Sequence, residues 1–120
     1  MKITMDENEA VQIVPIEYHS NGDDIRFIQE ILPQEELLCQ LAEECSELAK
    51  AALKLRRTYS NVNPTPVKRR EAMDSLVEEI ADVKLCLLVA GFEDVRTLIS
   101  TNRIMSAKAE RWAKRLEGRR

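Results

Sequence analysis

The sequence predicts an all-α fold of the four-helix-bundle type, and three observations lead to this prediction. Ala, Leu, Glu, Lys and Arg are abundant while aromatic residues make up 4% of the chain, a composition that favours helices. Apolar residues recur at spacings of three and four, which is the period of a helix with one buried face. Prolines and glycines are few, and they divide this pattern into four segments. A chain of 120 residues is long enough for one helical core.

The sequence predicts an N-terminal extension over residues 1–21 and a helical domain over residues 22–120. Part of the extension alternates weakly between apolar and polar residues and can form a short strand or an arm. The domain opens with a short helix that an aspartate, Asp23 or Asp24, can cap. Pro33 interrupts this helix, because proline lacks the backbone N–H that a helix interior requires.

The second helix is predicted from about Gln34 to Thr58. Glu44 lies on the shoulder of its apolar stripe, and Glu47 lies further round on the same side. The apolar positions of the stripe are Leu37, Leu41, Cys45, Leu48, Ala52 and Leu55.

A loop over residues 59–66, rich in proline and asparagine, leads to a third helix that ends near Gly91. After Asp82 this helix is apolar almost all round, and a helix that is apolar on every side is buried on every side. In a chain of this size such burial requires a partner subunit, so we expect a homodimer or homotetramer. The core stripe of this helix is Leu76, Ile80, Val83, Leu87 and Ala90.

The fourth helix is predicted from about Glu93 to Leu116. Its apolar face is formed by Val95, Leu98, Ile99, Met105, Ala109, Trp112 and Leu116.

The acidic residues of the second and third helices form two spaced motifs. Glu43-Glu44-Cys45-Ser46-Glu47 reads E-E-x-x-E, and Glu79-Ile80-Ala81-Asp82 reads E-x-x-D. Residues three apart share one face of a helix, and antiparallel packing of the two helices would oppose the pairs. Opposed carboxylates repel one another unless a cation lies between them. Oxygen ligands select hard cations, of which Mg²⁺ is the usual one beside phosphates.

The alternative interpretation is that these carboxylates are solvated helix surface. The position of the pairs on the shoulders of the apolar stripes supports the metal site. In addition, no Lys or Arg stands three or four residues from Glu79 to neutralise it.

Several other kinds of site are excluded by the residues that are missing. Di-iron bundles use Glu-x-x-His pairs, whereas the single histidine, His19, lies in the N-terminal extension. Nucleophilic catalysis by Ser–His–Asp or Cys–His lacks a histidine in a suitable place. No P-loop or dinucleotide-binding glycine motif occurs. The cysteines, Cys39, Cys45 and Cys86, form no C-x-x-C pair and are predicted to be buried, reduced thiols.

Charge is distributed unevenly along the chain. Residues 1–50 carry 12 acidic and 3 basic side chains, while residues 51–120 carry 9 acidic and 15 basic ones. The basic excess is strongest after Arg103. It is interpreted first as the C-terminal end of a helix, where cations are favourable, second as a phosphate-binding region and last as a nucleic-acid-binding tail. No apolar run is long enough to cross a membrane. Because the N-terminus lacks an apolar signal region, a cytoplasmic protein is expected.

The two acidic motifs resemble those of the MazG-like all-α nucleoside triphosphate pyrophosphohydrolases. Residues 41–48 (L-A-E-E-C-S-E-L) look like the first metal-binding helix of that family, and residues 76–83 (L-V-E-E-I-A-D-V) look like the second. The similarity covers roughly residues 24–116. The long segment between the motifs resembles the phage- and prophage-associated members.

The resemblance implies an activity and a set of site residues. It implies that Mg²⁺, with Mn²⁺ as a possible substitute, is held by the four catalytic carboxylates Glu44, Glu47, Glu79 and Asp82. The substrate would be a nucleoside or deoxynucleoside triphosphate, cleaved to a monophosphate and pyrophosphate.

A third family motif, N-x-K-x-x-R, contacts substrate phosphates. It is matched here by Lys108 and Arg111, with Ser106 in the place of the asparagine. The alternative function is a non-catalytic module of the same fold that binds nucleotides or mediates helical dimerisation.

Overall fold

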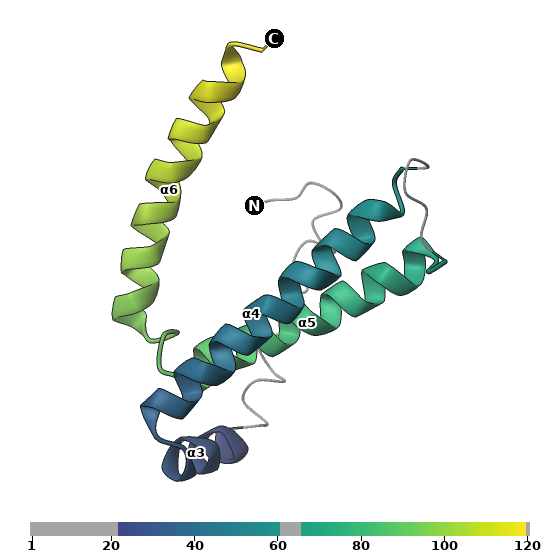
Figure 1. Ribbon diagram of the computed structural model, residues 1–120. Helices are drawn as coiled ribbons and strands as arrows, with labels where there is room; N and C mark the ends of the chain where they lie inside the picture. The colour runs from purple at the N-terminus through teal and green to yellow at the C-terminus, as the bar shows by residue number, and fades with distance from the viewer. Residues whose placement is uncertain (1–21, 61–65, 120) are drawn as a thin grey trace, which may run out of the picture. The chain divides into compact units, whose positions relative to one another are not determined.

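The computed structural model describes residues 22–60 and 66–119, and this part of the chain contains four α-helices and no strand (Figure 1). The all-α prediction is therefore confirmed. Contacts between residues divide the chain into two compact units, Met1–Leu32 and Pro33–Arg120. The predictions for residues 1–21, including His19, and for most of the loop after α4 lie outside the described residues. The helices are α3 (Gly22–Ile31), α4 (Gln34–Arg57), α5 (Arg69–Val89) and α6 (Val95–Glu117).

The start of α4 lies where the sequence predicts it, directly after Pro33. This proline has an extended backbone (φ −71°, ψ 161°), and its carbonyl accepts hydrogen bonds from the N–H groups of Glu36 and Leu37 at 3.0 and 3.1 Å. At the other end, the Thr58 hydroxyl donates to the Leu55 carbonyl at 2.7 Å. Both ends thus satisfy backbone groups that the helix itself leaves unpaired.

The end of α5 is set by Gly91, as the sequence predicts. This glycine has a positive φ of 89°, a conformation that residues with a Cβ seldom adopt. Its N–H donates to the Leu88 carbonyl at 3.1 Å, and the Phe92 N–H donates to the Leu87 carbonyl at 2.9 Å. These two bonds form a Schellman motif, which closes the helix.

The start of α6 is capped by Asp94, whose carboxylate accepts a hydrogen bond from the Thr97 N–H at 2.9 Å. Hydrogen bonding to the Thr97 side chain and then to its backbone N–H lowers the pKa of Asp94 below its ordinary value. A side-chain oxygen at this position satisfies one of the free N–H groups of the first turn.

Replacing Asp94 by Ala is expected to fray the first turn of α6. Because the lowered pKa belongs to the folded state, the stabilisation by Asp94 is present above the ordinary aspartate pKa, about 3.9, and is lost as pH falls through the lowered pKa. Hydrogen exchange of the Thr97 and Leu98 amides should accelerate in the variant at neutral pH. Glu93→Ala, at the preceding residue, is the control; equal acceleration in both variants would contradict the cap.

The helices α4 and α5 pack side by side and antiparallel (Figure 1). At one end of the pair, the Gln34 side-chain amide donates to the Ala90 carbonyl at 3.1 Å. At the other end, Arg69 donates to the Thr58 carbonyl at 2.8 Å, and its guanidinium lies 4.0 Å from the centre of the Tyr59 ring. These contacts tie the start of each helix to the end of the other.

The packed row of α4 differs from the predicted stripe at two positions. Cys45 and Ala52 are exposed, whereas Glu44 is half-buried and Ala51 is buried. The predicted stripe stepped between two adjacent rows of the helix, and packing against α5 selects one of them. The row with reduced exposure is Leu37, Leu41, Glu44, Leu48, Ala51 and Leu55.

The packed row of α5 shows the same shift. Ile80, predicted in the core, is 40% exposed, while its neighbour Glu79 is half-buried. In each helix of the pair a glutamate therefore lies on the packed row beside an apolar residue that is exposed. The row with reduced exposure is Ala72, Leu76, Glu79, Val83, Cys86 and Ala90.

The prediction for the cysteines is wrong at two of three positions. Cys86 is buried, but Cys39 and Cys45 are exposed. Both exposed thiols lie on α4 outside its packed row. On the third helix, Leu85 of α5 remains 44% exposed in the single chain, and its predicted burial by a partner subunit stays a prediction.

The apolar face predicted for the fourth helix is present on α6, and none of the residues of α6 is buried. Among the described residues, no helix has the length and apolarity needed to cross a membrane.

Candidate metal centre

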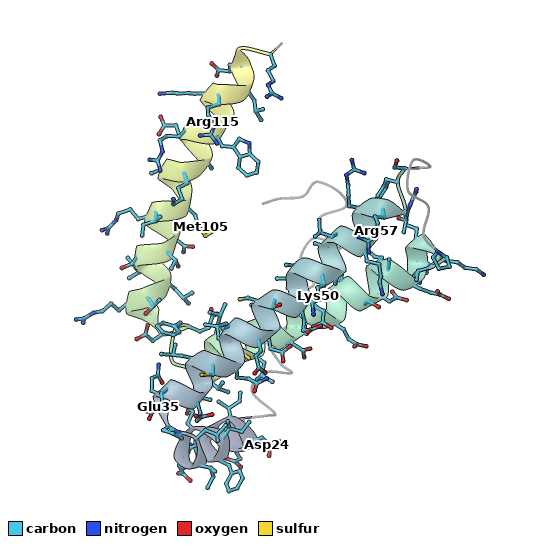
Figure 2. The ribbon with its side chains drawn as sticks, in the orientation of Figure 1. Asp24, Glu35, Lys50, Arg57, Met105 and Arg115 are labelled. Carbon is cyan, nitrogen blue, oxygen red and sulfur yellow. The ribbon has the colours of Figure 1, made fainter. Side chains whose placement is uncertain are left out.

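Three of the four predicted ligands lie together on the α4–α5 pair. Carboxylate oxygens of Glu44, Glu79 and Asp82 all lie within 4.8 Å of one another. Glu44 comes from α4, and the other two stand one turn apart on α5. Glu44 and Glu79 are half-buried and Asp82 is exposed, so the cluster opens to solvent on one side. Figure 2 shows oxygen-bearing side chains gathered along this helix pair near Lys50.

The electrostatics of the cluster reflect crowded negative charge. The pKa of Glu79 is raised above its ordinary value, first by desolvation and then by the charges of Asp82, Glu44, Glu47 and Glu78. The pKa of the neighbouring Cys86 thiol is also raised, first by burial and then by the charges of Glu44 and Asp82. A bound cation would relieve this repulsion.

Glu44 is oriented by Gln40, a residue that the sequence analysis missed. The Gln40 side-chain amide donates to a Glu44 carboxylate oxygen at 2.9 Å. The i, i+4 spacing of a Gln and a Glu on one helix was the available signal. A hydrogen bond of this kind holds a ligand carboxylate in one orientation and leaves its other oxygen for a metal ion.

The fourth predicted ligand, Glu47, lies outside the group of three. Its carboxylate faces Lys50, with the Lys50 Nζ 3.4 Å from Oε2. Its charge nevertheless contributes to the raised pKa of Glu79, so it stands near the cluster. Glu43 and Glu78 are exposed and do not belong to the group.

Lys108 and Arg111, the predicted phosphate-binding residues, lie three apart on exposed surface of α6. Neither makes an ion pair within the part of the chain that the structure describes. Lys114, further along the same helix, pairs instead with Glu110 at 3.6 Å. The role of Lys108 and Arg111 stays a prediction.

Replacing Glu79 by Gln is expected to raise the melting temperature of the metal-free protein. Because the folded-state pKa of Glu79 is raised, the folded chain holds this proton more tightly than the unfolded chain does. The native stability of the unmodified protein therefore falls as pH rises from 4.5, the ordinary value, through the raised pKa. The gain from Glu79→Gln should be present above this range and disappear below it.

This gain is measured by thermal unfolding in the presence of a chelator, at pH 7 and at pH 4. Glu78→Gln, at an exposed neighbour, should raise the melting temperature less. A lower melting temperature for Glu79→Gln at pH 7 would contradict the repulsion.

The donor set fits a hard divalent cation. Three carboxylates from two helices offer oxygen ligands, and the described residues bring no histidine to them. Mg²⁺ takes a few carboxylates and completes its octahedral shell with water and substrate phosphates. The open side of the cluster leaves room for such ligands.

The comparisons with known proteins add no relative: no family model, no curated protein and no solved structure matches the chain.

Proposed function

We propose that this chain is a Mg²⁺-dependent nucleotide pyrophosphohydrolase that converts a nucleoside or deoxynucleoside triphosphate into a monophosphate and pyrophosphate. The observation that carries the proposal is the cluster of Glu44, Glu79 and Asp82, with oxygens within 4.8 Å. Half-burying two glutamates on a packed helix row is unfavourable for folding without a compensating partner. Residues that break the packing pattern in this way are commonly functional.

The chemistry follows from the charges. Carboxylates alone would repel a triphosphate, whereas Mg²⁺ held by them would supply positive charge to neutralise charge that develops on the phosphate oxygens. Glu44, Glu79 and Asp82 would hold the cation, and Gln40 fixes the orientation of Glu44. One carboxylate of the site orients a water molecule and accepts its proton. The water oxygen bonds to the α-phosphorus, the bond from this phosphorus to the bridging oxygen breaks, and pyrophosphate leaves.

The test is product analysis with a panel of canonical, deoxy and modified nucleoside triphosphates. With Mg²⁺ or Mn²⁺ present, at least one substrate should give monophosphate and pyrophosphate in equal amounts, and a chelator should stop the reaction. Release of orthophosphate instead would contradict the proposed bond cleavage. Nucleotide binding without any product would favour the alternative, a non-catalytic binding module, which the departure at Ser106 supports.

We also propose that the chain assembles as a homodimer or homotetramer. The support is the apolar surface that single-chain folding leaves exposed, which includes most of the apolar row of α6. The large members of this row stand three, four or seven residues apart, as in helices that pack against a partner helix. The members of the row that are large, apolar and exposed are Val95, Leu98, Met105, Trp112 and Leu116.

Replacing Met105 by Glu is expected to weaken this assembly, because the side chain, 63% exposed in the single chain, would place a charge in an apolar contact. Light scattering coupled to gel filtration measures the mass of the particle. The control is Ala107→Glu, on the opposite face of the same helix. A monomeric unmodified protein, or equal masses for both variants, would contradict the proposal.

A further inference from the structure

A groove with a volume of about 430 Å³ lies on the α4–α5 pair next to the carboxylate cluster. Glu47 and Glu79 line it, and Ser75 of α5 lies against it. Glu79 thus belongs both to the cluster and to the groove, so the two form one continuous surface. The volume lies in the range of small-molecule sites in proteins, about 300–1,000 Å³.

The remaining charged lining of the groove is basic. Lys50, Lys54 and Arg57 project into it from α4, and their spacing of four and three places them on one face of the helix. From the first to the last they cover about 10 Å along the helix axis, at a rise of about 1.5 Å per residue. Figure 2 labels Lys50 and Arg57 toward the middle and the end of α4.

These cations have free hydrogen-bonding capacity. Lys54 and Arg57 make no ion pair among the described residues. Lys50 pairs with Glu47 at 3.4 Å, with its side chain 72% exposed, and exposed pairs of this kind are weak. All three side chains can therefore donate hydrogen bonds to a bound anion at a small cost in free energy.

The order of charges along the surface matches one class of ligand. A polyphosphate coordinated to a metal ion carries negative charge beyond what the ion neutralises, and this excess needs cationic donors close to the ion. Lys and Arg are the side chains that bind phosphate oxygens. The surface offers three carboxylates for the metal at one end and three cations beyond them.

We propose that this groove binds the polyphosphate chain of the substrate, with Lys50, Lys54 and Arg57 contacting the phosphates that extend away from the carboxylate cluster. The inference rests on the proposed function for the identity of the substrate. It assigns phosphate recognition to α4, the helix that also carries Glu44, independently of Lys108 and Arg111.

The simpler explanation of the basic residues is that cations suit the C-terminal end of a helix. The chain offers a matched control for it, because Arg56 stands in the same last turn as Arg57 and does not line the groove. Replacing either residue by Gln removes one charge from the same last turn of the helix. A difference between Arg57→Gln and Arg56→Gln therefore reports on the groove alone.

The experiment is calorimetric titration of the full chain with Mg²⁺ and either inorganic tripolyphosphate or a non-hydrolysable nucleoside triphosphate, at fixed salt. Lys54→Gln and Arg57→Gln are each expected to weaken binding about tenfold or more, the size of a lost hydrogen bond to a charged group. Arg56→Gln should change it less than about threefold. Circular dichroism checks that each variant keeps its helices and melting temperature.

If the groove variants bind both ligands more weakly and Arg56→Gln binds them normally, the result supports phosphate recognition by the groove. Equal weakening by all three variants overturns it, because only surface charge would then matter. Weaker binding of the nucleotide together with unchanged binding of tripolyphosphate also overturns it. If both ligands bind with the expected pattern but no nucleotide is cleaved, the groove stands and the proposed function fails. If nucleotide is cleaved and the groove variants bind normally, the function stands and the groove fails.

Discussion

Replacing Glu44 by Gln is expected to lower Mg²⁺-dependent release of pyrophosphate by more than about a hundredfold, because loss of even an outer-shell partner of a metal ligand costs about 10–100-fold. Glu44 is the one member of the cluster supplied by α4, so the change would remove the ligand that this helix offers to a bound ion. The amide keeps the size of the side chain, and it can still bond to Gln40. The helical fold should therefore survive.

The control is Glu43→Gln, which removes the same charge from the adjacent, exposed residue. It should retain most of the activity. Steady-state assays of the two variants, together with their circular dichroism spectra, separate a site effect from a general charge effect. Equal loss in both variants, or normal turnover in Glu44→Gln, would contradict the assignment of the cluster.

Replacing Leu37 by Ala is expected to destabilise the protein by about 2–5 kcal/mol, the usual cost of removing a buried leucine side chain. Leu37 is 5% exposed and lies on the packed row of α4, close to the Gln34–Ala90 contact. A loss of this size is a large share of the stability of a small domain. Because α4 and α5 supply the cluster jointly, binding of Mg²⁺ at the cluster should also weaken when the packing of the two helices is destabilised.

Chemical denaturation measures this loss, with Leu53→Ala as the control. Leu53 lies on the same helix but is 59% exposed, so the same truncation should cost less than about 1 kcal/mol. Similar losses for both variants would show that the packed row of α4 has been assigned to the wrong face.

The helix bounds could be predicted from the sequence because local chemistry sets them. Pro33 fixes the start of α4, and Gly91 ends α5 through a Schellman motif. Asp94 caps α6. Each of these devices acts within a few residues of the chain, so no knowledge of the tertiary structure is needed to recognise it.

The packed faces were harder to predict, because α4 and α5 each carry apolar residues on two adjacent rows. Cys45 and Ile80 are apolar residues on the predicted stripes, yet packing leaves both exposed. Glu44 and Glu79 lie instead on the rows with reduced exposure. A helical wheel cannot choose between neighbouring rows when both are apolar. The choice depends on the register of the two helices.

The same limit applies to the site. The spacing of the acidic motifs indicated that Glu44, Glu79 and Asp82 can meet, and the structure brings them together. The position of Glu47 against Lys50 depends on the rotamers of both side chains. The row of Lys54 and Arg57 becomes part of a groove only when α5 lies beside it, which no spacing within α4 reveals.

The most direct test of the central claim is a crystal structure of the protein with Mn²⁺, in place of Mg²⁺, and a non-hydrolysable nucleoside triphosphate, with the metal located by anomalous scattering. The account predicts an ion coordinated by carboxylate oxygens of Glu44, Glu79 and Asp82 and by a phosphate oxygen of the nucleotide. An ion and nucleotide bound elsewhere, with these three carboxylates uncoordinated, would contradict it.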